Sequence, residues 1–182
     1  TGKRLDGIDS IVTTTNHADF DYGTGNFTWD FWFVLDEVAS GEYPSFLYTG
    51  TSNNEYRLKF QNSNQILYLQ CADGDLQVAD LGASVADSKW HNLVLTRTSG
   101  VIDTYLDGKK VDSVTTHAGN VNTNSNNLII GQNGSDQFNG KFGRVSLWKG
   151  LALSQTQIRK MMFMDWTTVD AEGTIDDSYC KT

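Results

Sequence analysis

The fold class of this chain is decided by Phe27-Thr28-Trp29-Asp30-Phe31-Trp32-Phe33-Val34. Aromatic residues stand at every second position, and Trp32 and Val34 add bulk to the positions between them. Successive side chains of a β-strand point to opposite faces, so both faces of this segment carry bulky side chains. A strand that buries both faces is central in its sheet and covered on each side. We therefore predict a central strand here.

Shorter stretches with the same alternation lie along the rest of the chain, separated by clusters of Gly, Asn, Asp and Ser. Many short strands between turns are typical of a β-sandwich or barrel. The dipeptide Asp107-Gly108 suits the positive φ angles of a tight hairpin. The further predicted strands are Ser45–Thr49, Glu55–Gln61, Gln65–Cys71, Leu76–Asp80, His91–Thr98, Val101–Asp107, Lys110–Thr116, Asn127–Gly131 and Lys141–Lys149.

Only one segment has the pattern of a helix. Ser154 is a good N-cap, and Ile158, Met161 and Met162 follow at helical spacing. The rest of the chain is predicted to be all-β.

Composition narrows the classes of function. The chain has 182 residues, the size of one domain, and its 14 basic and 22 acidic residues give a formal net charge of -8. Nucleic-acid binding needs clustered cations to neutralise phosphates, so the sequence disfavours it, and an anionic membrane surface is disfavoured for the same reason. No apolar run approaches the roughly 20 residues that a spanning helix requires, so we expect no membrane insertion.

The first residue and the two cysteines carry information about the cellular compartment of the protein. Thr1 is not a methionine, which favours a removed leader or a cut from a longer precursor. The two cysteines, Cys71 and Cys180, lie far apart, and neither belongs to a CxxC motif. Two interpretations stay open: a Cys71–Cys180 disulfide in an oxidising compartment, or two unrelated thiols.

Several motifs together resemble one family. Trp90-His91-Asn92-Leu93-Val94-Leu95, followed by Tyr105-Leu106-Asp107-Gly108, is similar to the core of laminin-G-like and pentraxin-like domains of the concanavalin A-like lectin/glucanase superfamily. Asn26–Phe33 resembles another strand of these domains, and residues 138–158 resemble their ending. Leu5-Asp6-Gly7 is similar to the usual opening strand. The motifs keep the family order over nearly the whole chain.

The resemblance implies an antiparallel β-sandwich of the jelly-roll type, with one of its two sheets concave. We assign this domain to residues 1–164. The acidic residues 165–182 are either a strap packed on the domain or a segment that reaches a neighbouring subunit. Trp90 is expected to pack in the core and fill one end of the sandwich, since a large ring before an alternating strand suits that place.

No catalytic group is apparent in the sequence. Glycosidases on this fold use a Glu-x-Asp-x-Glu strand, which places three carboxylates on one face, and this chain has no such segment. His17, His91 and His117 occur singly, with no nucleophile motif around any serine. We therefore predict that the protein is not an enzyme.

Calcium is the one cofactor that the sequence suggests. Related domains often hold it with loop carboxylates and carbonyls, and oxygen is the ligand that calcium prefers. The candidate ligands are Asp19 and Asp21, before a loop where the carbonyls of Gly23 and Gly25 could converge, and Asp136. The alternative is that these acids belong to solvated loops. Gly143 stands where relatives often carry an acid, and it counts against a family-type metal site.

A glycan site needs aromatic platforms for sugar faces and polar groups for hydroxyls. The middle strands supply both kinds of residue. The candidate ligand-binding residues are Tyr43, Tyr48, Tyr56, Arg57 and Tyr68, with Asn53, Asn54 and Gln70 nearby.

Two functions follow from this pattern. The first is a non-catalytic recognition or attachment module on a cell or particle surface or in the extracellular space, with a glycan or a protein surface as its partner. The second is a structural subunit of an assembly, such as a virion decoration or fibre protein, which would form a homo-oligomer or a larger particle. Both place the domain on an outer surface.

Overall fold

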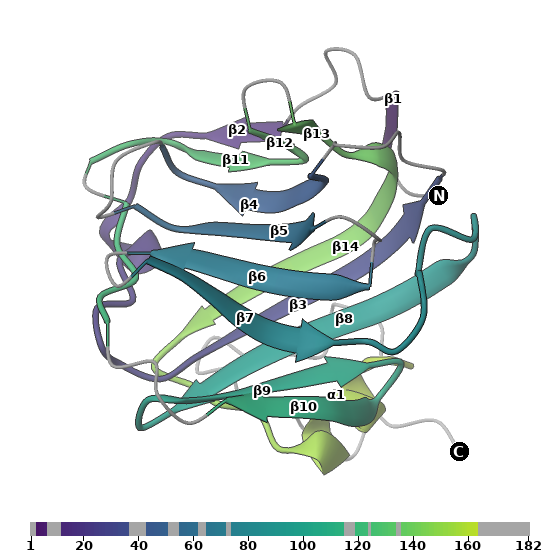
Figure 1. Cartoon of the computed structure of the whole chain (residues 1–182). Coiled ribbons are helices and arrows are strands. Elements are labelled where there is room, and N and C mark those ends of the chain that lie inside the picture. Colours follow the sequence, from purple (N-terminus) through teal and green to yellow (C-terminus); the bar gives the residue numbers. More distant parts are fainter. Residues whose placement is uncertain are drawn as a thin grey trace.

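The computed structural model of the protein describes residues 3–6, 12–36, 43–50, 55–61, 65–71, 74–114, 119–123, 125–133 and 136–163. Within these residues the chain forms two antiparallel sheets of six strands each, packed face to face (Figure 1). This confirms the predicted β-sandwich. The expected tail, 165–182, lies outside the described residues.

Sheet A contains the central strand that the aromatic repeat predicts. Its order is β1 (Lys3–Asp6), β14 (Asn139–Lys149), β3 (Phe27–Leu35), β8 (Trp90–Thr98), β9 (Val101–Leu106) and β10 (Lys109–Val114).

Sheet B lies in front of sheet A in Figure 1. Its order is β2 (Val12–Thr14), β11 (Leu128–Ile130), β4 (Ser45–Tyr48), β5 (Arg57–Gln61), β6 (Ile66–Cys71) and β7 (Gly74–Asp80). A short 3-10 helix, η1 (Ala18–Phe20), precedes β3, and a small hairpin joins β12 (Gln132–Asn133) to β13 (Asp136–Gln137).

The core lies between the two sheets. Along β3, Phe27, Trp29, Phe31 and Phe33 point into it and are fully buried. The opposite face of β3 is also buried, because Thr28 and Asp30 lie beneath the segment that contains α1 (Gln155–Met161). Both faces of this strand are therefore covered, as the sequence predicts.

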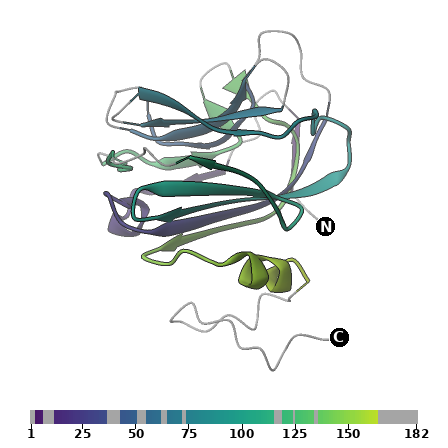
Figure 2. The same ribbon diagram turned by 60° about the horizontal axis from the view of Figure 1, so that its bottom comes forward.

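The helix α1 covers part of the outer face of sheet A (Figure 2). It begins at Ser154, whose side chain accepts a hydrogen bond from the backbone N–H of Gln157 in a capping box. Ile158 and Met161 of α1 pack on Val94 and Tyr105 in a second, smaller apolar cluster. No helix among the described residues is both long and apolar enough to cross a membrane.

Two glycines, Gly108 and Gly140, are required by the local backbone geometry. Asp107 and Gly108 both have positive φ, and Leu106 pairs with Lys109, so this dipeptide forms the expected two-residue hairpin. A Cβ atom on Gly140 would lie 2.0 Å from the carbonyl oxygen of Val34. Glycine is therefore needed at this position of β14, next to the end of β3.

Trp90 does not pack in the core, and that expectation is wrong. It is 46% exposed, and it lies on the outer face of sheet A together with Asn92 and Val94, because strand alternation turns His91 and Leu93 inward. A Cβ atom on Gly143 would lie 3.0 Å from Cζ3 of Trp90. The ring thus covers the glycine that stands in place of the acid found in relatives.

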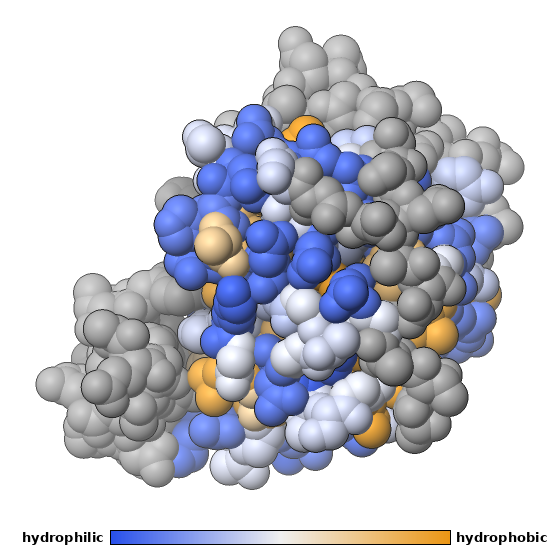
Figure 3. Space-filling model, turned by 90° about the vertical axis from the view of Figure 1, so that its left-hand side faces the viewer, coloured by the Kyte–Doolittle hydropathy of each residue, from blue (hydrophilic) through white to orange (hydrophobic). Residues whose placement is uncertain are grey.

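Hydrophobic residues are scattered over another side of the molecule. The surface at the left of Figure 1 is mostly hydrophilic, with apolar residues present singly (Figure 3). Among the described residues drawn there, no extended apolar patch offers a docking surface.

Candidate functional site

The outer face of sheet B presents polar and aromatic side chains in two rows across four strands. Strand register aligns Tyr48, Arg57, Gln70 and Asp75 in one row. The second row contains Ser45, which is fully buried, with Lys59, Tyr68 and Gln77. Between the rows, the intervening leucines of β4 to β7 (Leu47, Leu58, Leu69 and Leu76) point to the core side. We call these two rows, with Tyr43, the sheet-B face.

Direct contacts organise the second row. Nζ of Lys59 lies 5.4 Å from the centre of the Tyr43 ring and 3.6 Å from Oδ2 of Asp75. The Tyr68 hydroxyl donates to Oε1 of Gln77 over 3.4 Å. Lys59 is only 9% exposed although it lies on an outer face. Its ammonium group is therefore held in place by an aromatic ring and a carboxylate.

The structure brings four of the five predicted ligand-binding residues together on this face: Tyr43, Tyr48, Arg57 and Tyr68. All four are partly exposed. Asn53 and Asn54, named beside them in the sequence, lie outside the described residues.

Tyr56 is not part of the site, and its assignment is wrong. It is fully buried, and its ring packs 5.3 Å from the Trp29 ring and 5.9 Å from the Tyr22 ring. Burial, together with the nearby Tyr22 and Asp21, raises the pKa of Tyr56. The physical reason is alternation, since Tyr56 directly precedes Arg57 and must point to the opposite side of the sheet.

Sequence reasoning missed Lys59, Asp75 and Gln77. The signal for Lys59 was present in the pattern: it stands two residues after Arg57, in one strand, and therefore on the same face. Asp75 and Gln77 depend on how β7 aligns with β6, where a bulge shifts the register between Leu67 and Tyr68. That shift cannot be read from the sequence.

The loop predicted to hold calcium is organised by an arginine. Arg97 is fully buried, and the three nitrogens of its guanidinium group donate to the carbonyl oxygens of Gly25 (Nε, 2.8 Å), Gly23 (Nη2, 2.6 Å) and Gly119 (Nη1, 3.0 Å). Its guanidinium also lies 4.9 Å from the centre of the Phe27 ring. The carbonyls do converge, but on a cation supplied by the chain, which would repel a calcium ion beside it.

The acids of this loop have protein partners as well. Oδ1 of Asp21 accepts hydrogen bonds from the backbone N–H and hydroxyl of Thr123, at 2.6 and 2.9 Å. Asp19 is exposed and lies 3.1 Å from Nδ1 of His17. Together with the Arg97 contacts, this donor set does not fit a calcium ion, and we derive no role for calcium from it.

Asp136, the third predicted ligand, lies in β13 and pairs with Asn133. The structure describes the backbone of this segment and not its side chains. Among the described residues, no three His, Cys, Asp or Glu side chains are grouped so that they could hold a metal ion.

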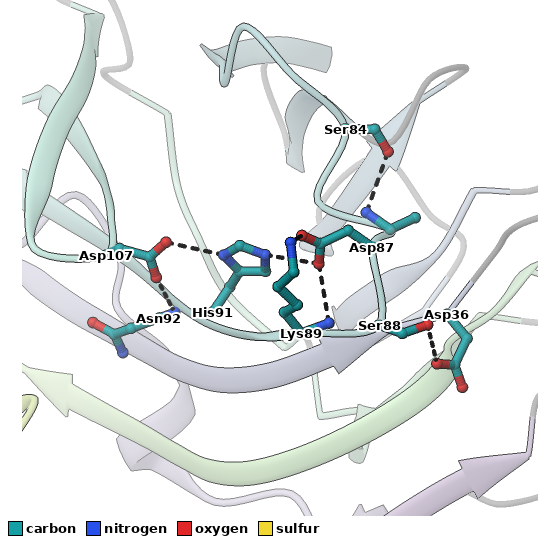
Figure 4. Close-up of polar contacts among 9 residues, drawn as sticks. Asp36, Ser84, Asp87, Ser88, Lys89, His91, Asn92 and Asp107 are labelled. Carbon is teal, nitrogen blue, oxygen red and sulfur yellow. Dashed lines mark hydrogen bonds and ion pairs between the residues drawn. The ribbon is translucent and has the colours of Figure 1, made fainter.

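His91 lies between two carboxylates (Figure 4). Its Nδ1 is 2.9 Å from Oδ2 of Asp107, and its Nε2 is 3.1 Å from Oδ1 of Asp87. Hydrogen bonds from Lys89 and then from His91 lower the pKa of Asp87 to about 2. Both ring nitrogens are engaged, so this histidine fastens the loop before β8 to the β9–β10 turn. His117 lies outside the described residues.

Cys71 is buried in the core at the end of β6. Cys180, its predicted disulfide partner, lies outside the described residues, so the Cys71–Cys180 pairing stays a prediction.

A two-sheet jelly roll with a polar and aromatic outer face defines a lectin-like class of protein. A family model described as the concanavalin A-like lectin/glucanases superfamily matches residues 6–159. The chain belongs to this superfamily, which confirms the resemblance seen in its motifs. A comparison with curated proteins gives no match.

Solved structures share the fold at low sequence identity. Domain 4 of AbnA, an extracellular arabinanase from Geobacillus stearothermophilus solved with arabinotriose, has a TM-score of 0.67 at 15% identity over 86% of this chain and 73% of its own. The binding domain of Paraclostridial Mosquitocidal Protein 1 has a TM-score of 0.64 at 15% identity, over 88% of this chain and 42% of its own. The binding domain of Botulinum Neurotoxin DC, in complex with SialylT, has a TM-score of 0.62 at 15% identity, over 87% and 40%. This chain therefore spans less than half the length of the two toxin domains.

Proposed function

We propose that this protein is a non-catalytic binding module of an extracellular, cell or particle surface, and that it binds carbohydrate through the sheet-B face. The observation that carries the proposal is the two-row arrangement of side chains on that face. Tyrosine rings, amides and charged groups lie side by side over four adjacent strands. Their combination matches the chemistry of a sugar, which has apolar ring faces and hydroxyls at its edges.

The dimensions of the face support an oligosaccharide rather than a single sugar. Four strands at about 4.8 Å spacing cover about 14 Å across the sheet, and the two rows are about 7 Å apart along the strands. A short chain of sugars laid across the strands would meet Tyr48 on β4 and Tyr68 on β6, with β5 between them. Arg57 and Gln70 would donate to its hydroxyls from the row of Tyr48.

The two cations give the face its selectivity. Lys59 is already engaged by Asp75 and Tyr43, so it is held in one position and donates without further ordering. Arg57 offers a planar fork of donors two residues away. We infer that this spacing favours sugars with adjacent hydroxyls or a carboxylate near the Arg57 end.

Two further points support binding without chemistry. The only histidine that the described residues place in a cluster of carboxylates, His91, uses both ring nitrogens for Asp87 and Asp107. The comparison structures are domains of enzymes or toxins that are themselves described by what they bind. We propose a glycan partner for this chain by analogy with them.

The test is a glycan array followed by calorimetry with the best ligand. Tyr68→Ala and Tyr48→Ala each remove one ring from the sheet-B face, and we expect Kd to rise about tenfold, which corresponds to about 1.4 kcal/mol. Trp90→Ala is the matched control, because it removes an exposed aromatic ring from the other sheet and should leave Kd unchanged.

Three results would go against the proposal. Loss of binding in Trp90→Ala with normal binding in Tyr68→Ala would move the site to sheet A. Hydrolysis of the glycan by the pure protein would overturn the non-catalytic assignment. An array without signal at high protein concentration, together with copurification in a capsid or filament, would favour the structural-subunit alternative.

A further inference from the structure

The outer face of sheet A carries an exposed apolar surface beside α1. It consists of Trp32, Trp90 and Gly143, and we call it the aromatic shelf. A Cβ atom on Gly143 would lie 3.0 Å from the Trp90 ring and 3.6 Å from Cβ of Trp32, so the three residues are packed together. Trp90 remains 46% exposed, which is unusual for the largest apolar side chain.

The end of α1 lies close to this shelf. Nη1 of Arg144 donates to the carbonyl oxygen of Met161, the last residue of α1, over 3.0 Å. Arg144 directly follows Gly143 and pairs with Trp32 in the ladder between β14 and β3. The helix therefore ends over the strand position next to the shelf. Phe163, the last described residue, is 85% exposed.

The residues that follow have the composition to cover an apolar surface with a lysine at its edge. Residues 164–182 include Trp166 and Tyr179, and they contain five acidic residues and one lysine. Lys141 shares a row with Trp90 through Val34. Lys89 directly precedes Trp90, and its Nζ lies 3.0 Å from Oδ2 of Asp87. A chain of 19 residues can extend to about 60 Å, so length does not limit its reach across the shelf.

We propose that residues 164–182 pack across the aromatic shelf of their own chain, with Trp166 against Trp90 and acidic side chains facing Lys141. Two observations select this occupant. The described chain leaves α1 beside the shelf, so the local concentration of the segment is high. The acidic charge of the segment is opposite to that of Lys141, which lies in the row of Trp90. In this arrangement α1 and the segment together cover sheet A, and the sheet-B face is the surface left for ligands.

The test uses the full chain labelled with 5-fluorotryptophan. The five tryptophans, Trp29, Trp32, Trp90, Trp148 and Trp166, give five fluorine resonances, which single Trp→Phe substitutions assign. We expect the Trp90 resonance to be protected from a soluble gadolinium chelate. Trp166→Ala should shift that resonance and at least double its paramagnetic relaxation. Trp148, which packs beside α1, serves as the internal reference.

The matched control is Thr168→Ala, a substitution in the same segment that removes no aromatic ring and should leave the Trp90 resonance unchanged. A Trp90 resonance that Trp166→Ala does not move would overturn the proposal. A shift that disappears on dilution, with a dimer in light scattering, would assign the shelf to the segment of a second copy. A Trp90 resonance that responds to the array-selected glycan and not to Trp166→Ala would make the shelf a sugar site instead. None of these outcomes depends on the sheet-B face, so the two proposals are tested separately.

Discussion

Oδ2 of Asp30 lies 2.8 Å from Nε of Arg144; the side chain of Asp30 is fully buried, and that of Arg144 is 12% exposed. Arg144 also holds the end of α1 through the carbonyl of Met161, while Asn92 donates to the other oxygen of Asp30 over 2.5 Å. Burial raises the pKa of Asp30, and the charge of Arg144 is the largest effect that opposes the rise. The pair thus joins β3, β14, β8 and the helix in one network.

Arg144→Met should destabilise the protein by about 3–5 kcal/mol, because it leaves a buried carboxylate without its counter-charge. The pKa of Asp30 in the folded state lies above its unfolded value, so folding takes up a proton and stability rises as the pH falls. The loss should therefore be greater at pH 7 than at pH 5. Urea unfolding at the two pH values measures it. The double variant with Asp30→Asn should recover part of the loss, and an equal loss at both pH values would contradict this account.

Asp87→Asn should change the acid limb of the stability curve. Hydrogen bonds from Lys89 and His91 hold the pKa of Asp87 at about 2 in the folded protein, below the ordinary value near 4. A lowered pKa contributes stability that is present above the unfolded pKa and is lost as the pH falls through the folded one. Melting temperatures between pH 6 and pH 2 should show a steeper fall for the wild type than for Asp87→Asn. Asp19→Asn, at an exposed position far along the chain, is the control and should keep the wild-type slope.

Arg97→Met should cost about 3 kcal/mol, because the carbonyl oxygens of Gly23, Gly25 and the buried Gly119 lose their donors at once. Lys109→Met is the control, since Lys109 is exposed on β10 and its loss should change stability little. The same samples test calcium. Because a guanidinium occupies the centre of the loop, the melting temperature should be the same in calcium and in a chelator such as EGTA. A calcium-dependent rise that Asp21→Asn abolishes would show that the loop binds the ion after all.

Gly140→Ala should destabilise the fold by about 3 kcal/mol, at the upper end of the usual cost of overpacking. The added Cβ would meet a backbone oxygen 2.0 Å away, and a backbone atom of a central strand cannot move aside. Gly82→Ala is the control, because nothing lies within 4 Å of a Cβ there and only its positive φ opposes the change, at about 1 kcal/mol. Guanidinium unfolding of the two variants compares them directly. Similar losses would mean that β14 can shift away from Val34.

Most of the fold could be predicted because its signals are local. The aromatic repeat of β3 marks a central strand by itself, and Asp107-Gly108 sets a hairpin by its backbone preference. Trp90 shows where local reasoning stops. Its ring suits a core, yet its parity with Asn92 and Val94 places it on the face opposite to Phe33 and Leu93. The alternation of side chains along β8 is visible in the sequence. The expectation of core packing relied on the size of the Trp90 ring instead of on this alternation.

The site depends more on contacts between distant segments. Tyr48, Arg57 and Tyr68 were found because each lies in a predicted strand, and alternation alone would have excluded Tyr56. The pairing of Lys59 with Asp75 and the capture of the Gly23 and Gly25 carbonyls by Arg97 join residues far apart in the chain. The spacing of residues along the sequence does not predict such pairs, because they depend on the register of the sheet and on which loops meet at the end of the sandwich.

The position of α1 makes the two outer surfaces of the sandwich unequal. The helix α1 covers part of the outer face of sheet A, whereas no helix covers sheet B among the described residues. A molecule tethered by its helix-covered side to a resin, a sensor chip or a larger particle would hold Tyr48 and Tyr68 outward, toward the medium. For carbohydrate binding through the sheet-B face, as proposed above, the orientation of the domain on a support would therefore decide whether a ligand can reach that face.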